Sequence, residues 1–156
     1  MDVDGILTDG RIIVDDTGKE IKIFDVKDGF GLVILKKAGI KTAIISARFS
    51  KAVTVRAKDL KIDKVYQDAQ PKLDAYEALL KNLKLSDEEV CFIGDDLPDV
   101  AVLERVGFAV TVPSAAAEVK RVCDYITQKD GGKGAVRELI ELILKTQGKW
   151  DAALTK

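Results

Sequence analysis

The chain begins with a pair of aspartates whose spacing suits covalent and acid–base chemistry. They stand two residues apart in Asp2-Val3-Asp4, and Gly5 follows directly. In an extended segment this spacing directs both carboxylates to the same side. One carboxylate can attack an electrophile as a nucleophile, while the other transfers protons to a leaving group and from water. This opening segment therefore predicts catalysis by paired carboxylates.

Further polar residues follow three later apolar runs of the sequence. They are Ser46 and Arg48 after KTAII, Lys72 shortly after KVYQ, and Asp95, Asp96 and Asp99 after VCFI. Loops that follow parallel strands meet at one edge of the sheet, where open α/β sheets bind ligands. Clustered carboxylates repel one another unless a cation lies between them. Mg²⁺ binds such oxygen ligands together with phosphate, so the sequence predicts magnesium-dependent phosphoryl transfer.

The composition argues against several other classes of protein. The 156 residues suit one domain over residues 1–156, and the absence of histidine removes the commonest general base and zinc ligand. A net charge of −1 gives no basic footprint for nucleic acid or an anionic membrane. No apolar run approaches the ~20 residues of a membrane span. Cys91 and Cys123 form no CxxC pair, and we expect buried thiols in a cytoplasmic protein.

Short apolar runs alternate with amphipathic helical patterns along the chain. Strands are predicted over residues 41–46, 64–67, 90–94, 108–112 and 124–127. Helices are predicted over 28–39, 50–60, 71–83, 99–107, 115–123 and 134–147, and Ser86 to Glu89 forms a capping-box pattern. This alternation predicts an α/β fold in which a parallel sheet is covered by helices on both faces.

Residues 11–26 interrupt this alternation with the pattern of a β-hairpin. Two alternating runs flank Asp15-Asp16-Thr17-Gly18, and the runs contain Ile12, Val14, Ile21 and Ile23. An isolated two-stranded hairpin is marginally stable in water. One interpretation is that the hairpin packs on another subunit, and the alternative is that it folds back on its own core.

The polar motifs resemble those of the haloacid dehalogenase superfamily of phosphatases. The matching segments are DVDGILTDG, IISAR, Lys72 at the start of its helix, and GDDLPD. The hairpin, VKDGFG, GDDLPDVAVLERVG and GGKGAVRELIELILKTQGKW resemble the 3-deoxy-D-manno-octulosonate 8-phosphate (KDO 8-phosphate) phosphatase family along essentially the whole chain. The resemblance implies a Rossmann-like core with the hairpin in place of a cap domain. It also implies a cytosolic, Mg²⁺-dependent tetramer that hydrolyses this sugar phosphate through an aspartyl-phosphate in lipopolysaccharide biosynthesis.

The resemblance also implies roles for the aspartates. Asp2 would be the nucleophile and a metal ligand. Asp4 would be the general acid/base and would bind the metal through its backbone carbonyl. Asp95 would be the third protein ligand, and Asp96 and Asp99 would orient either Asp95 or the lysine.

For the substrate, the resemblance implies that Ser46 and Lys72 bind the phosphoryl group. Arg48 matches an arginine that the family uses for its substrate. Arg56 is a second candidate for the sugar carboxylate, and a solvated helix arginine is the alternative interpretation. The loop at residues 131–134 precedes a helix, so its N–H groups can meet an anion, and a plain flexible turn is the alternative interpretation. The tail at residues 148–156 either reaches a neighbouring subunit or frays.

Alternative functions differ from this one in substrate or in chemistry. A related phosphatase acts on a nine-carbon, sialic-acid-type sugar 9-phosphate, and it carries an acidic residue where Arg48 stands. A receiver-like signalling domain also gathers aspartates and a lysine at a sheet edge, and an inactive family member is a third alternative. Only Met1 precedes Asp2, so we also expect natural residues before Met1 that complete the first strand.

Overall fold

Parallel strands form the centre of the protein in the computed structural model, which describes residues 1–155. Strands β3 (Ala43–Ile45) and β4 (Lys64–Tyr66) pair in parallel. Strands β5 (Cys91–Ile93), β6 (Phe108–Thr111) and β7 (Tyr125–Ile126) form a second parallel sheet. The predicted α/β class and the parallel pairing are confirmed.

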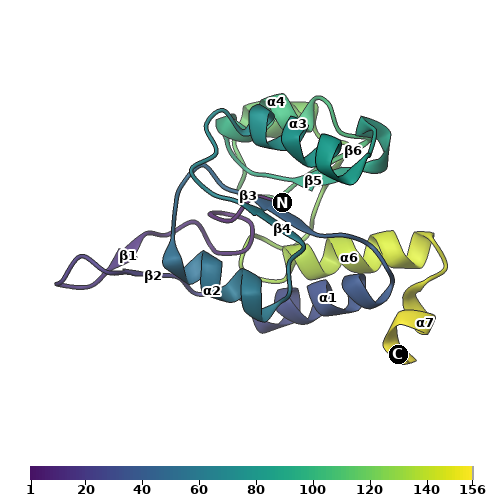
Figure 1. Ribbon diagram of the computed structural model, residues 1–156, viewed down its shortest axis with the longest axis horizontal. Helices are drawn as coiled ribbons and strands as arrows, with labels where there is room; N and C mark the ends of the chain where they lie inside the picture. The colour runs from purple at the N-terminus through teal and green to yellow at the C-terminus, as the bar shows by residue number, and fades with distance from the viewer. Residues whose placement is uncertain (156) are drawn as a thin grey trace.

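Helices cover both sides of these strands (Figure 1). Helices α3 (Lys72–Leu83) and α4 (Val100–Leu103) lie on one side, followed in the chain by α5 (Ala117–Val122). Helices α1 (Val26–Lys37), α2 (Lys51–Asp59) and α6 (Ala135–Thr146) lie on the other side. No helix within residues 1–155 is long and apolar enough to cross a membrane.

One predicted helix is shorter in the structure, and one helix was not predicted. The helix predicted over 99–107 is limited to α4, because a 3₁₀ turn at Leu97–Asp99 precedes it and the chain leaves the helix before Gly107. A Cβ on Gly107 would lie 2.5 Å from the Glu88 carbonyl oxygen, so the chain passes too closely for a side chain there. The tail forms a further helix, α7 (Trp150–Thr155), in which Ala153 is buried.

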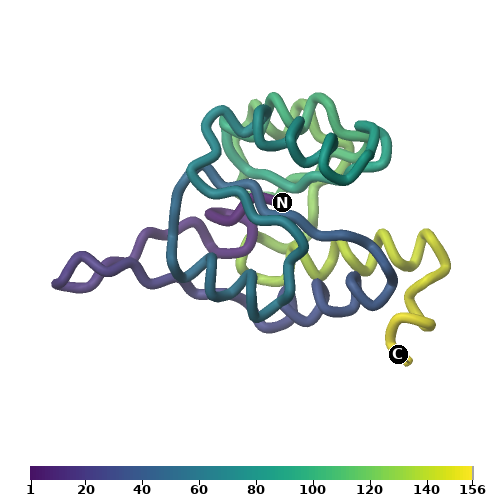
Figure 2. The backbone as a smooth tube through the Cα atoms, in the orientation of Figure 1, coloured from purple at the N-terminus to yellow at the C-terminus, as the bar shows by residue number. Residues whose placement is uncertain are grey.

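The predicted hairpin projects from the body of the protein (Figures 1 and 2). Strands β1 (Ile13–Val14) and β2 (Glu20–Ile21) pair in the antiparallel sense. The side chains of Ile12, Val14, Ile21 and Ile23 remain 47 to 62% exposed. The alternative in which these apolar side chains fold back on the core is therefore wrong.

The N-terminal residues connect the two parallel sheets. The Met1 ammonium donates to the Ala43 carbonyl at 3.0 Å, and the Ile45 N–H donates to the Met1 carbonyl at 3.0 Å. On the other side, the Asp2 N–H donates to the Ile93 carbonyl at 3.0 Å. Figure 2 shows this end of the chain in the middle of the molecule. Asp2 thus takes the position expected for a residue at the end of a central strand.

An apolar cavity of about 450 Å³ continues from Met1 between β3 and β5. Its lining includes Leu35, Ile45, Leu79, Ile93 and Ile140. Burial here lowers the pKa of the Met1 ammonium to about 6. The cavity therefore has the apolar lining and the flanking strands that an additional strand requires.

We predict that extending the chain before Met1 by about five apolar, β-branched residues stabilises the protein. The added strand would pair with β3 and β5 and bury its side chains in the cavity, at roughly 1.5–3 kcal/mol for each fully buried side chain. Thermal unfolding should show a melting temperature raised by about 5 °C or more. A glycine–serine extension of equal length is the control, and equal melting temperatures for the two extensions would contradict this prediction.

Candidate active site

A buried lysine lies between two buried aspartates where the sheets meet. Lys72 is the first residue of α3, and its Nζ lies 2.5 Å from Asp2 Oδ1 and 2.6 Å from Asp99 Oδ1. The three side chains are 2 to 8% exposed. Burial alone lowers the pKa of the Lys72 ammonium, but the two carboxylates outweigh it and raise that pKa. Lys72 is therefore held in its charged form.

A third carboxylate adds negative charge that Lys72 does not offset. Oxygen atoms of Asp2, Asp95 and Asp99 all lie within 4.8 Å of one another. Asp95 Oδ1 is buried and has no hydrogen-bond partner among residues 1–155. Burial raises the pKa of Asp2 to about 6. Burial and the charges of Asp2 and Asp99 raise the pKa of Asp95 to about 7. A divalent cation fits this donor set because it would both pair the orphaned oxygen and offset the excess charge.

Within this cluster, Asp99 already has partners for both of its oxygens. Oδ1 accepts from Lys72, and Oδ2 accepts from the backbone N–H groups of Asp95 at 3.0 Å and Asp96 at 3.3 Å. The Asp96 side chain accepts from the Leu97 N–H at 2.8 Å, so it caps the turn that carries Asp95. These contacts suit the supporting roles predicted for Asp96 and Asp99.

Asp4 lies on the turn that follows Asp2, beside the cluster. The N–H groups of Ile6, Leu7 and Thr8 all donate to the Val3 carbonyl and close this turn. Gly5 has φ +96°, and a Cβ there would lie 2.0 Å from Asp95 Oδ2. A larger residue would displace Asp95, so this glycine allows the cluster of carboxylates to form.

The loop at residues 131–134 packs against the turn that carries Asp4 and Gly5. A Cβ on Gly131 would lie 1.7 Å from the Gly5 carbonyl oxygen, and the Gly132 N–H donates to the Ile6 carbonyl at 2.9 Å. The anion that meets the N–H groups here is the buried side chain of Asp28, which accepts from Gly134 at 3.2 Å and Arg137 at 2.8 Å. The loop is therefore a support for the turn.

The residues predicted to bind substrate lie in different surroundings. Ser46 is buried directly after β3, and its Oγ accepts from the Arg48 N–H at 3.4 Å. The Arg48 guanidinium lies 3.4 Å from Asp4 Oδ2. Arg56 instead pairs with Asp59 at 2.8 Å and lies over the ring of Phe24. No ion pair within residues 1–155 joins Arg56 to Asp2 or Asp4, and its substrate-binding role stays a prediction.

Two side chains beside Asp4 were missed by the sequence analysis. Glu20 of β2 pairs with Arg48 at 2.6 Å, and Lys22, just after β2, pairs with Asp4. The alternation in Lys19-Glu20-Ile21-Lys22-Ile23 could have identified them, because it places Glu20 and Lys22 on one face of the strand and the two isoleucines on the other.

Comparisons with known proteins agree on one family. A family model described as haloacid dehalogenase-like hydrolase matches residues 35–140. The curated 3-deoxy-D-manno-octulosonate 8-phosphate phosphatase KdsC of Escherichia coli K12 is 42% identical over 153 residues, which cover 98% of this chain and 81% of the relative.

Solved structures of relatives superpose along nearly the whole chain. The 3-deoxy-D-manno-octulosonate 8-phosphate phosphatase from Moraxella catarrhalis, in complex with a magnesium ion, a phosphate ion and KDO, is 48% identical. Its TM-score is 0.96, with 99% of this chain and 89% of that chain covered. The Yersinia pestis enzyme is 42% identical, with a TM-score of 0.94 and coverage of 96% and 81%.

We predict that Asp95→Asn stabilises the metal-free protein at pH 8. Because the folded-state pKa of Asp95 is raised to about 7, the stability linked to its protonation is present below about pH 4 and is lost as the pH rises through 7. The amide carries no charge to bury. Thermal unfolding should show the variant melting about 5 °C or more above the wild type at pH 8, with the gap closing towards pH 4.

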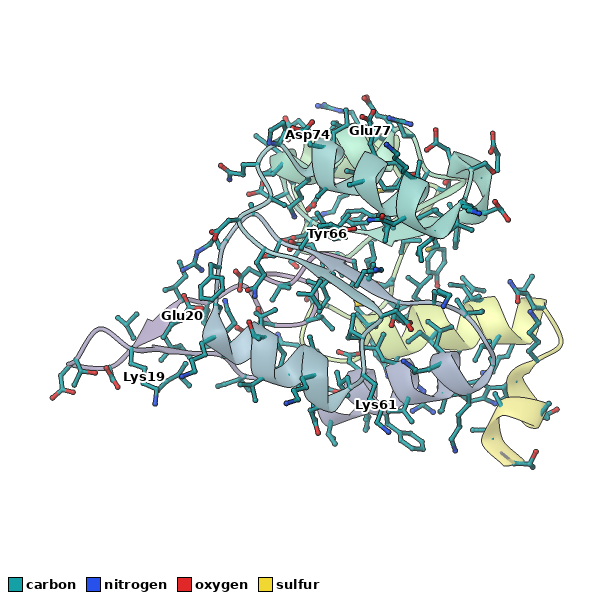
Figure 3. All side chains as sticks on the ribbon, in the orientation of Figure 1. Lys19, Glu20, Lys61, Tyr66, Asp74 and Glu77 are labelled. Atoms are coloured by element: carbon teal, nitrogen blue, oxygen red, sulfur yellow. The ribbon has the colours of Figure 1, made fainter. Side chains whose placement is uncertain are left out.

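Mg²⁺ should raise the melting temperature of the wild type at pH 8 and have little effect on Asp95→Asn. Asp74→Asn is the matched control, since Figure 3 shows Asp74 on the outer side of α3, and it should respond to Mg²⁺ as the wild type does. An equal Mg²⁺ response in Asp95→Asn, or no gap at pH 8, would contradict the assignment of Asp95.

Proposed function

The chain belongs to the haloacid dehalogenase-like hydrolases and, within them, to the 3-deoxy-D-manno-octulosonate 8-phosphate phosphatase family, and from this premise we propose how its residues act. It is a Mg²⁺-dependent phosphoric monoester hydrolase that releases phosphate from KDO 8-phosphate, a step in lipopolysaccharide biosynthesis. The proposed residue roles rest on one observation, the buried Asp2–Lys72–Asp99 arrangement next to the Asp95 oxygen that has no hydrogen-bond partner.

Asp2 is the nucleophile in this proposal. Its carboxylate attacks phosphorus and forms an aspartyl-phosphate, and the bond between phosphorus and the sugar oxygen breaks. Asp4 gives its proton to that leaving oxygen, so the free sugar acid departs as an alcohol. Asp4 then accepts a proton from water, whose oxygen attacks phosphorus and releases phosphate and the Asp2 carboxylate.

Positive groups and hydroxyls hold the transferring oxygens during both steps. The Lys72 ammonium lies 2.5 Å from Asp2 and pairs with one oxygen of the phosphoryl group. The Ser46 hydroxyl donates to a second phosphoryl oxygen. The Asp2 and Asp95 carboxylates and the Asp4 backbone carbonyl hold Mg²⁺. When bound, the ion neutralises charge on the phosphoryl oxygens and allows two anions to approach each other.

Arg48 recognises the sugar acid in this proposal. Its side chain is 42% exposed and its guanidinium lies 3.4 Å from Asp4 Oδ2, which places a cation beside the leaving group. A guanidinium pairs with a carboxylate in a bidentate geometry. This positive charge supports KDO 8-phosphate over the nine-carbon sugar 9-phosphate, whose phosphatases carry an acidic residue there.

The exposed apolar side chains of the hairpin support an oligomer. Ile12, Val14, Ile21 and Ile23 are 47 to 62% exposed on an element that projects from the body, and gathered exposed apolar side chains mark interaction sites. We propose that these side chains pack on another copy of the chain in a cytoplasmic homotetramer.

We predict that Asp2→Asn abolishes turnover. The amide is no nucleophile, so release of phosphate from KDO 8-phosphate with Mg²⁺ should fall by a factor of about 10⁴ or more. Asp9→Asn in the same motif is the control, because Asp9 is exposed and pairs with Arg11, and it should keep wild-type turnover. Substantial activity in Asp2→Asn would reject the nucleophile.

We also predict that Arg48→Met weakens substrate binding selectively. Loss of a charge-assisted pair costs roughly 1.5–3 kcal/mol, so KM for KDO 8-phosphate should rise about tenfold or more. KM for p-nitrophenyl phosphate, which has no carboxylate, should change much less. Steady-state kinetics on both esters, and on the nine-carbon 9-phosphate, measure this. Equal changes for both esters, or a wild-type preference for the nine-carbon ester, would contradict the role of Arg48.

A further inference from the structure

Lys22 is a buried cation beside Asp4 that the catalytic scheme above does not use. Its side chain is only 2% exposed, although lysine is rarely buried without a paired charge. It hydrogen-bonds Asp4 Oδ1 and lies 2.9 Å from Glu20 Oε1, to which it makes an ion pair but no hydrogen bond. The strongest polar contact of this buried ammonium is therefore with the acid/base residue.

Lys22 belongs to a closed ring of charges around Asp4. Arg48 Nη2 lies 2.6 Å from Glu20 Oε2, and Arg48 Nη1 lies 3.4 Å from Asp4 Oδ2. The ring therefore runs from Asp4 through Lys22, Glu20 and Arg48 back to Asp4, with two positive and two negative charges. Because the charges balance, the ring can form without an external ion.

The sequence of the hairpin positions this ring. Glu20 and Lys22 are two residues apart, so they share one face of the strand and point towards the site. Ile21 and Ile23 on the opposite face are 47% and 62% exposed. Figure 3 shows Glu20 and Lys19 on the projecting hairpin, near where it joins the body. The hairpin therefore contributes side chains to the chemistry as well as an apolar surface.

The two oxygens of Asp4 have different partners, and this determines which one can react. Oδ1 is held by the buried Lys22, whereas Oδ2 faces Arg48 at 3.4 Å, and Arg48 is 42% exposed. A substrate carboxylate can draw Arg48 away from Oδ2, but it has no comparable access to the buried Lys22. Oδ2 is thus the oxygen that exchanges a proton with the leaving group.

We propose that Lys22 is a positioning residue that holds Asp4 through Oδ1 and offsets the carboxylate charge that develops as Asp4 gives up its proton. This inference rests on the proposed role of Asp4. As the phosphorus–oxygen bond breaks, its electron pair stays on the sugar oxygen, and the proton moves from Asp4 Oδ2 to that oxygen. The carboxylate left on Asp4 then faces the Lys22 ammonium.

The dependence on the leaving group separates this role from a structural one. A sugar alkoxide needs a proton to depart, whereas p-nitrophenolate is a stable anion that does not. The ratio kcat/KM reports steps up to departure of the leaving group, so it excludes the later attack of water. Loss of Lys22 should therefore lower kcat/KM for an alkyl ester and spare an aryl ester.

The test compares Lys22→Met with the wild type on KDO 8-phosphate and on p-nitrophenyl phosphate, both with Mg²⁺. We expect kcat/KM for the sugar phosphate to fall about 30-fold or more, chiefly through kcat, and for the aryl ester to fall less than about threefold. Lys22→Arg, which keeps the charge, should recover part of the loss. Lys19→Met removes an exposed lysine from the same hairpin and should behave as the wild type.

Equal losses on the two esters would overturn the proposal, as would a loss confined to KM. If Lys22→Met has a lowered melting temperature, the same comparison of the two esters is made with Lys22→Gln. Adding Lys22→Met to Asp4→Asn should cause no further loss on the sugar phosphate, because the group that Lys22 serves is already gone. If Asp4→Asn alone leaves turnover of the sugar phosphate unchanged, Asp4 is not the acid/base residue. This result refutes the role of Asp4 and is distinct from a result that refutes only the role of Lys22.

Discussion

The site depends on the excess negative charge where the two parallel sheets meet. Asp2, Asp95 and Asp99 bring three carboxylates within 4.8 Å, and the chain supplies one buried ammonium, Lys72, among them. The protein alone leaves this charge uncompensated, as the raised pKa values of Asp2 and Asp95 indicate. A divalent cation would offset this excess charge, and it would then allow an anionic phosphoryl group to approach the carboxylates.

Close backbone contacts hold these like charges together. The glycines at positions 5 and 131 allow Asp95 and the loop at residues 131–134 to pack against the turn that carries Asp4. The buried side chain of Asp28 fixes the end of that loop and the start of α6 by accepting from the backbone N–H groups of Gly134 and Arg137. The hairpin adds Glu20 and the buried Lys22, which pair with Arg48 and with Asp4. Segments far apart in the sequence therefore combine to position the acidic residues.

Most of this arrangement could be predicted from residue types and their order. Polar residues at the ends of apolar runs identified Asp2, Ser46, Lys72 and Asp95, because parallel strands bring such ends to one edge. The contact of Lys22 with Asp4 was not predicted, since the placement of a hairpin over a site depends on tertiary packing. The early end of the helix at Leu103 was not predicted either, and the close approach of Gly107 to Glu88 depends on the same kind of tertiary packing.

The central claim is that the Asp2 carboxylate becomes phosphorylated during turnover. Borohydride reduces an aspartyl-phosphate to homoserine, so the enzyme is quenched with borohydride during turnover of KDO 8-phosphate with Mg²⁺. Peptide mass spectrometry then locates the reduced residue. The account predicts homoserine at position 2 and at no other aspartate, and only when substrate is present. Homoserine at another aspartate, or no homoserine at position 2, would contradict the account.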